Sequence, residues 1–415
     1  MKKILIVEFW SHYKRPLLEK IMRLWYQLYI AATTYPKRLS EIIPKERFIL
    51  TDTYNSVLLL ADVSIFINSS NITFDWIGTF WEATVTQTAD LAGALWLPNI
   101  SWVGARRSSQ NKLLMRIFCQ RAHIKMPKFC SIHLDDPEFY QKVCSFWFPS
   151  VIKPLYWSSS QWVIMLNSEY DVITTIQKVK ASTSLKTEEV FKNFSWQMLL
   201  EEYLPWRLIS LDWLIYNWEV TFAGSVEFFM WKEPYFTQIW SIIPAQLSET
   251  DLKSAQEYVL TIIKALRFDN CWFHCELRIS ENGPLLIEIA ARLPWGPLIL
   301  WYEKAFGIDL IKGITDIWTN TRPSIHKTRE HFSLHKCVFP KITNTVTLLW
   351  LTGTEWFSQN EYIWDYIQEK NIGDKIRTYP EIPDSVVYYA LTHTNREEIL
   401  SISSTLESKL TFLHD

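Results

Sequence analysis

The stretch from residue 271 to 296, CWFHCELRISENGPLLIEIAARLPWG, decides the fold because it predicts two strands joined by a short turn. The first strand carries His274, Glu276 and Arg278 at alternate positions, so these three side chains share one face. The second strand carries Glu288 among apolar neighbours. The pattern therefore predicts a β-hairpin with polar side chains gathered on one face.

The turn of this hairpin sets which residues face each other. The Asn-Gly pair at 282–283 suits a two-residue turn, but Pro284 has no N–H to donate to the closing pair, which favours a five-residue connection. Glu276 then lies opposite Glu288, with the Cβ atoms about 4.5–5.5 Å apart. Two facing carboxylates repel each other unless they share a cation or a proton, and oxygen ligands suit magnesium or manganese. The alternative is a solvated strand face on which Arg278 neutralises one glutamate.

The sequence of the hairpin resembles the metal-binding segment of ATP-grasp enzymes, and most closely that of L-amino-acid ligases. The resemblance rests on His-Cys-Glu-Leu-Arg, a Gly-Pro turn, and Leu-Leu-Ile-Glu-Ile-Ala-Ala-Arg-Leu-Pro. It implies that Glu276 and Glu288 hold magnesium against the phosphates of ATP. It also implies that Arg292, with His274, stabilises the reacting acyl group. Many ATP-grasp proteins have asparagine two residues after the second glutamate, where this chain has Ala290.

Composition narrows the class of protein. A chain of 415 residues is too long for one ordinary core, and 48% hydrophobic with 21% charged residues is typical of a globular protein. A net charge of −2 provides no basic field for nucleic acid or for a membrane surface, and no apolar run approaches the roughly 18–20 residues that span a bilayer. Six scattered cysteines predict no disulfide framework, so we expect a reducing, cytoplasmic compartment. Cys271 and Cys275 flank His274, but Cys275 alternates to the opposite face, which argues against zinc.

The order of the segments predicts the fold class, α/β and α+β. Strands and helices alternate through about residue 120, which indicates a parallel sheet, and a fourth strand is expected to end within ADVSIFINS at 61–69. The resemblance implies an ATP-grasp fold with a preATP-grasp α/β domain over 1–104. The ATP-grasp domain then covers 105–320, with an ATP lid over about 125–200 and a catalytic lobe over about 201–320. A C-terminal α+β subdomain covers 321–415.

Two segments supply candidate lysines for the nucleotide. The pattern Asn-Lys-x-x-x-Arg, in the predicted helix before a proline, resembles the segment in which a lysine reaches ATP, and that lysine is Lys112. Spacing alone favours a solvated helix lysine instead. In FPSVIKPLYWSSSQWVIML, a strand ends near Lys153 and Pro154 breaks it. A loop of small residues can cover phosphates with backbone N–H groups, and the resemblance assigns the strand lysine to the α- and β-phosphates. The loop candidates are Ser158, Ser159 and Ser160, for which a serine-rich turn is the alternative.

A further predicted strand ends in a segment that is a candidate for binding the adenine base of ATP. In WQMLLEEYLPW, the sequence Glu201-Glu202-Tyr203-Leu204 resembles the adenine hinge, in which the backbone at Glu202 and Leu204 binds the base and a carboxylate takes an amino or hydroxyl group. The alternative is an edge strand with charged ends. Asp212, on the next strand, is predicted to face outward and is given no role.

Tryptophan is unusually frequent and glycine unusually rare. There are 22 Trp and 10 Gly, against a usual glycine share of about 7%. Trp25 and Trp96 stand at predicted helix ends, which commonly need a left-handed residue such as glycine, and Asn217-Trp218 stands in a turn that prefers Asn-Gly. Other tryptophans fall where the family pattern has glycine, namely Trp147, Trp157, Trp162, Trp206 and Trp295. We hypothesise that a reassigned stop codon, written here as Trp, means Gly in the source; the alternative is a genuinely Trp-rich, decayed homologue.

Together the segments predict an ATP-dependent carboxylate–amine ligase that forms an amide or peptide bond through an acyl phosphate and releases ADP and phosphate. The cofactors implied are ATP and Mg2+ (or Mn2+). The partners expected are small-molecule carboxylate and amine substrates such as amino acids, with no nucleic acid and no membrane, and with a homodimer as one open oligomeric state. The alternatives are a carbamoyl-phosphate or biotin-carboxylase-like enzyme and a catalytically inactive nucleotide-binding homologue.

Overall fold

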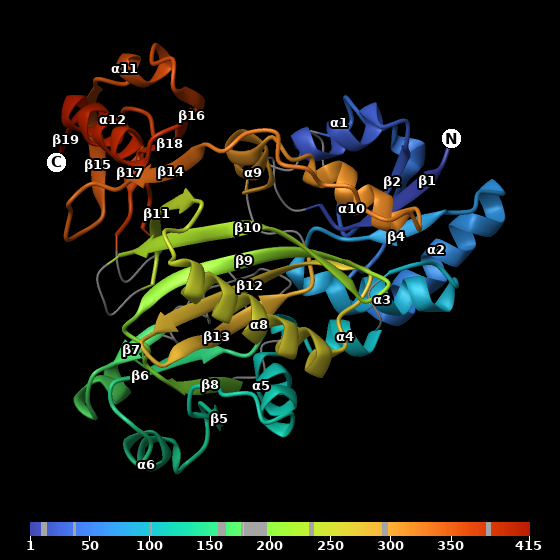
Figure 1. Cartoon of the computed structure of the whole chain (residues 1–415), viewed down its shortest axis with the longest axis horizontal. Coiled ribbons are helices and arrows are strands. Elements are labelled where there is room, and N and C mark those ends of the chain that lie inside the picture. Colours follow the sequence, from blue (N-terminus) through green and yellow to red (C-terminus); the bar gives the residue numbers. More distant parts are fainter. Residues whose placement is uncertain are drawn as a thin grey trace.

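The computed structural model describes residues 1–9, 15–35, 39–99, 102–156, 163–175, 177, 197–231, 236–292, 298–378 and 383–415. Figure 1 shows a long central antiparallel sheet, with an N-terminal α/β layer on one side, a smaller sheet below it and the C-terminal elements at the far end. None of the helices within these ranges is long and apolar enough to cross a membrane.

The N-terminal region contains a four-stranded parallel sheet in the order β3-β2-β1-β4, as predicted. Ile4 and Ile6 of β1 face a core shared with α1, α9 and α10, whereas Leu5 and Val7 face α2 and α3. This alternation places helices on both faces of the sheet. Its elements are β1 (Lys3–Val7), α1 (Arg15–Arg23), β2 (Gln27–Ala32), η3 (Lys45–Arg47), β3 (Phe48–Leu50), α2 (Ser56–Ser70), β4 (Trp76–Gly78), η4 (Glu82–Thr84), α3 (Val85–Ala94) and α4 (Trp102–Arg106).

The strand predicted to end within 61–69 is wrong, because this stretch lies inside helix α2. The side chain of Asn55 caps the helix by accepting from the N–H groups of Val57 and Leu58. Leu59 and Val63, one turn apart, are fully buried against the sheet. The β-branched residues of this stretch favour a strand locally, but the cap and the buried helical stripe outweigh that preference.

A small antiparallel sheet, in the order β5-β8-β6-β7, lies below the central sheet (Figure 1). Strand β6 ends at Pro154, the residue predicted to end it. Helix α5 precedes this sheet and carries Lys112 at its first position. The elements of this region are η5 (Ser109–Asn111), α5 (Lys112–Arg121), β5 (Phe129–His133), α6 (Phe139–Cys144), β6 (Ser150–Pro154), β7 (Ile164–Leu166) and β8 (Gln197–Glu202).

The central sheet has eight strands in the order β13-β12-β9-β10-β11-β14-β18-β16, and the neighbouring strands pair antiparallel. Helix α8 covers one face of it, and helices α9 and α10 cover the other. Three of its strands come from beyond residue 330, so the C-terminal segment continues the same sheet as the hairpin. The elements are β9 (Arg207–Tyr216), β10 (Glu219–Met230), β11 (Gln238–Ile243), α8 (Glu249–Leu266), β12 (Cys271–Ser280), β13 (Gly283–Ala290), α9 (Leu298–Phe306), α10 (Leu310–Trp318), β14 (Phe332–Val338), β16 (Ile363–Gln368) and β18 (Val387–His393).

A three-stranded sheet, in the order β17-β15-β19, and two helices complete the chain. Their bounds are β15 (Val346–Thr352), α11 (Glu355–Ser358), β17 (Lys375–Ile376), α12 (Arg396–Lys409) and β19 (Thr411–His414).

Three tryptophans occupy backbone positions that favour glycine. Trp25, Trp96 and Trp218 have φ of 66°, 56° and 65°, in the left-handed region, as predicted for Trp25 and Trp96 at their helix ends and for Trp218 in its turn. Their side chains are 79%, 94% and 62% exposed. Trp147 and Trp206 do not adopt this conformation. Trp157, Trp162 and Trp295 lie outside the described residues.

Candidate functional site

The hairpin of β12 and β13 places Glu276 directly opposite Glu288, the pairing predicted from the sequence. The route to that pairing differs from the prediction. Ser280 pairs with Gly283, so the turn has two residues and not five, and the register shifts later, beside Glu276. A β-bulge at Ile287 supplies the extra residue that brings Glu288 opposite Glu276.

Arg116 of helix α5 holds this bulge in place. Its Nη2 donates to the carbonyl oxygen of Ile287 at 2.8 Å, and its Nε donates to the Glu201 carboxylate at 2.5 Å. Arg116 and Glu201 are both buried. One arginine therefore joins the hairpin with the predicted hinge, a role that the Asn-Lys-x-x-x-Arg pattern alone did not reveal.

Two predicted lysines lie close to the carboxylates. Lys112 Nζ is 3.5 Å from Glu288 Oε2, and Lys153 makes an ion pair with Glu201. Burial alone would raise the pKa of Glu288, but Lys112 and Lys153 together hold it below its ordinary value. Burial lowers the pKa of the Lys153 ammonium, and the Glu201 carboxylate opposes that effect.

Glu201 is a buried anion that two neighbouring cations stabilise. Burial would raise its pKa, but the charges of Arg116 and Lys153 lower it to about 2. The neighbouring Glu202 uses its backbone N–H to donate to the carbonyl oxygen of Lys128, and its side chain accepts from the backbone N–H of Lys128. The Glu202 N–H is therefore already used by Lys128.

A pocket of about 320 Å³ joins these groups. Its lining includes every predicted site residue that the structure describes: Lys112, Lys153, Glu201, Glu202, Tyr203, Leu204, His274, Glu276, Glu288 and Arg292. Ser158, Ser159 and Ser160 lie outside the described residues. The sequence did not single out the apolar part of the lining, which includes Val151, Leu208, Phe228, Met230, Phe236, Ile287, Leu298 and Trp301. In the sequence these residues look like ordinary alternating core positions, so only the fold shows that they line a cavity.

The facing carboxylates give the pocket a donor set for a hard cation. Magnesium is usually held by one or two carboxylates together with water and substrate phosphates, and it does not need a cage of protein ligands. Glu276 and Glu288 fit that pattern, and Lys112 lies on the side of Glu288. In the described ranges no three His, Cys, Asp or Glu side chains form a metal-binding group.

His274 lies between two carboxylates on the same face of the sheet. Its Nδ1 is 2.8 Å from Asp212 Oδ1, and its Nε2 is 3.4 Å from Glu276 Oε1. Burial would lower the pKa of His274, but Asp212 and then Glu276 raise it to about 10. The prediction that Asp212 faces outward is wrong, because its side chain is fully buried. Strand β9 has helices over both faces of the sheet, so the simple alternation of inward and outward positions does not apply to it.

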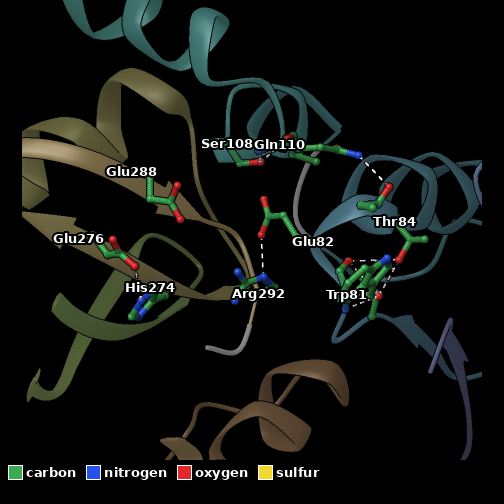
Figure 2. Close-up of polar contacts among 12 residues, drawn as sticks. Trp81, Glu82, Thr84, Ser108, Gln110, His274, Glu276, Glu288 and Arg292 are labelled. Atoms are coloured by element: carbon green, nitrogen blue, oxygen red, sulfur yellow. Dashed lines mark hydrogen bonds and ion pairs between the residues drawn. The ribbon is translucent and has the colours of Figure 1, made fainter. Parts of the chain in front are cut away.

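Arg292 follows strand β13 and reaches the N-terminal region. Its Nε is 2.6 Å from Glu82 Oε2, and both side chains are buried. Figure 2 shows Arg292 joined to Glu82, with Glu276 and Glu288 to one side of them. Glu82 belongs to η4, whose Ala83 carbonyl oxygen accepts from Gln110 Nε2 at 2.9 Å. The sequence gives no signal that Glu82 meets Arg292.

The middle of the chain is similar to a known protein family. Residues 146–296 match the family described as the ATP-grasp domain. No curated protein sequence matches the chain.

Among solved structures, the L-amino acid ligase from Bacillus licheniformis is 19% identical with a TM-score of 0.80, covering 100% of this chain and 99% of that one. Phosphoribosylglycinamide synthetase from Anaerococcus prevotii is 13% identical with a TM-score of 0.70, covering 100% of both chains. N5-carboxyaminoimidazole ribonucleotide synthetase from Thermotoga maritima is 17% identical with a TM-score of 0.70, also covering 100% of both. The likeness extends over the whole chain and confirms the predicted fold.

Proposed function

Because the chain carries an ATP-grasp domain within an ATP-grasp fold, we propose that it is an ATP-dependent carboxylate–amine ligase that works through an acyl phosphate. The observation that carries the proposal is the facing pair of Glu276 and Glu288 in a pocket that also contains Lys112, Lys153 and Arg292. This arrangement combines anionic groups for a cation with fixed positive charges for phosphates and a carboxylate.

The base of ATP belongs at the hinge. The Glu202 carbonyl oxygen would accept from the amino group of the base and the Leu204 N–H would donate to its ring nitrogen, since the Glu202 N–H is already bound to Lys128. Apolar side chains such as Val151, Met230 and Ile287 line the pocket and provide surfaces for a flat ring.

The phosphates belong between the lysines and the hairpin. Lys153 and Lys112 supply positive charge, and Ser158, Ser159 and Ser160 are the proposed loop contacts. Glu276 and Glu288 would hold magnesium, which would supply positive charge to offset the negative charge of the triphosphate.

The reaction has two substitutions. A substrate carboxylate oxygen attacks the γ-phosphorus, the bond from that phosphorus to the β,γ-bridging oxygen breaks, and ADP leaves. An amine then attacks the acyl carbon, the bond to the phosphate oxygen breaks, and the amine proton leaves with the phosphate. Arg292 would stabilise the negative oxygen that develops on the acyl carbon, and His274 would add a second donor. Amino acids are the substrate class that the hairpin motif favours.

Phosphate release in a screen of carboxylate and amine pairs tests the proposal. The protein should carry glycine at Trp157, Trp162, Trp206 and Trp295, and the amide product should be identified by mass spectrometry. ADP, phosphate and amide should form in equal amounts only when both substrates are present. Glu276→Gln and Glu288→Gln should abolish turnover, whereas Glu281→Gln, an exposed carboxylate in the turn of the same hairpin, should not.

Two outcomes contradict the proposal. Turnover that requires bicarbonate and no carboxylate–amine pair indicates a carboxylase-like or carbamoyl-phosphate-forming enzyme. Nucleotide binding without turnover for any pair indicates an inactive homologue.

A further inference from the structure

A buried hydrogen-bonded cluster behind the pocket joins strands β9 and β12 to helix α9. Asp212 is its centre and is fully buried. Its Oδ1 lies 2.8 Å from His274 Nδ1, and its Oδ2 accepts from Tyr302 Oη at 2.7 Å and from Ser210 Oγ at 3.1 Å. Asp212 is not among the residues that line the pocket, whereas His274 is.

The strand register fixes this geometry. Asp212 and His274 are directly paired on neighbouring antiparallel strands, and Ser210 is paired with Glu276 one step along the same face. Directly paired residues have Cβ atoms about 4.5–5.5 Å apart, which suits a carboxylate and an imidazole in contact. With Nδ1 held by Asp212, the ring directs Nε2 to Glu276 and the pocket.

A glycine makes room for the third member of the cluster. Gly224 pairs with Asp212 from strand β10. A Cβ atom at Gly224 would lie 2.4 Å from Tyr302 Cε1 and 2.9 Å from Phe306 Cε2, so a side chain there would displace these two rings. Only glycine at this position lets Tyr302 reach Asp212.

The cluster therefore connects the histidine with a wall of the pocket. Helix α9 carries Tyr302, and it also carries Leu298 and Trp301, which line the pocket. A shift of α9 that breaks the Tyr302 bond would also release one oxygen of Asp212 and loosen the imidazole. Such a partner of a site histidine fixes which ring nitrogen faces the reaction.

We propose that Asp212 is a positioning residue that fixes the His274 imidazole with Nε2 toward Glu276 and the pocket. Through its hydrogen bond to Asp212, Tyr302 makes this orientation depend on the position of helix α9 against the sheet. The proposal rests on the ligase function above for its effect on turnover, but its geometric part does not. Asp212 itself touches no substrate and acts through His274.

Two variants test the turnover part. Asp212→Asn should lower kcat by roughly 10–100-fold, as the loss of such supporting partners commonly does, while the Kd of a non-hydrolysable ATP analogue changes less than about threefold. Tyr302→Phe should lower kcat by a smaller factor in the same way. Tyr389→Phe is the matched control, because Tyr389 lies in the same sheet and its buried hydroxyl donates to the Glu407 carboxylate of helix α12, and neither residue lines the pocket. It should destabilise the protein and leave kcat unchanged.

Nuclear magnetic resonance of 15N-histidine protein reads the orientation without turnover, with the His274 signals assigned from the His274→Gln spectrum. Asp212→Asn should shift the Nδ1 signal of His274 strongly, Tyr302→Phe should shift it moderately, and Tyr389→Phe should leave it unchanged. The proposal is overturned if Asp212→Asn leaves this signal in place, or if kcat falls in Tyr389→Phe as much as in Tyr302→Phe. A parent protein that has no ligase activity but shows the expected histidine shifts would refute the proposed function and keep the positioning role.

Discussion

Replacing Trp25, Trp96 and Trp218 by glycine should stabilise the protein. Each backbone is left-handed, a conformation in which a Cβ atom crowds the following carbonyl oxygen. Each side chain is mostly exposed, so little packing is lost when it is removed. The backbone hydrogen bonds at these positions, such as that from the Trp218 N–H to Asp269 Oδ1 at 2.9 Å, remain available to glycine.

The magnitude follows from two opposing terms. A left-handed residue with a Cβ atom costs roughly 1–2 kcal/mol relative to glycine. Glycine loses more chain entropy on folding, which offsets about 0.5–1 kcal/mol of that gain. We expect a net gain of about 0.5–1 kcal/mol per position, and about 1.5–3 kcal/mol for the triple variant because sites in separate loops usually act independently.

Urea unfolding, followed by circular dichroism, measures this gain. The midpoint of the triple variant should rise while the slope of the free energy of unfolding against urea stays the same. Trp350→Gly is the matched control, because Trp350 is 56% exposed but lies in strand β15 without a left-handed backbone. That variant should lose about 0.5–1 kcal/mol. A triple variant less stable than the parent, at the same slope, would refute the reasoning.

Four further predictions follow from the site and from the tryptophan positions. Arg116→Met should lower the free energy of unfolding by about 3–5 kcal/mol because it leaves the buried Glu201 with one cation fewer, whereas Lys142→Met, at an exposed pair, should leave the urea midpoint unchanged. Glu82→Gln should lower kcat for ligation more than it changes ATP affinity, since it weakens the ion pair of Arg292; equal losses in both would contradict that role. The pKa of the Glu201 carboxyl is about 2 in the folded protein and 4.5 ordinarily, so its contribution to stability is complete above about pH 4.5 and is lost as the pH falls toward 2. Glu201→Gln should therefore reduce the dependence of the free energy of unfolding on pH over that range. An unchanged pH dependence would count against the ion pairs of Glu201. Intact-mass analysis of protein from the source should show a deficit equal to a whole number of tryptophan-to-glycine differences; agreement with the mass of the printed sequence would end the codon hypothesis.

The sequence predicted the features that depend on local order. The facing pair of Glu276 and Glu288, the parallel N-terminal sheet and the helix ends at Trp25 and Trp96 all follow from residue alternation and turn chemistry. The hairpin also shows a limit, since two routes lead to the same pairing. A longer turn and a bulge each add one residue, and the strand register shows that the chain uses the bulge, at the residue whose carbonyl oxygen accepts from Arg116.

The contacts that the sequence did not predict join segments far apart in the chain. Glu82 and Arg292 meet because the N-terminal layer packs against the central sheet, and no periodicity encodes that approach. The prediction that Asp212 faces solvent was wrong because strand alternation assumes that one face of the sheet is exposed to solvent, whereas helices cover both faces of strand β9. Long-range packing, and not local preference, decides these positions.

The continuity of the central sheet has a consequence for shortened forms of the protein. Strand β14 pairs with β11 on one side and with β18 on the other. A polypeptide that stops before Phe332 would keep every pocket-lining residue but would lose strand β14. The N–H and C=O groups of β11 that pair with β14 would then lie unpaired at an exposed edge of the sheet. Such edges pair with the strands of other chains, so fragments of this kind should self-associate. A minimal version of the enzyme must therefore retain residues 332–415, about the last fifth of the chain, to stay monodisperse in solution.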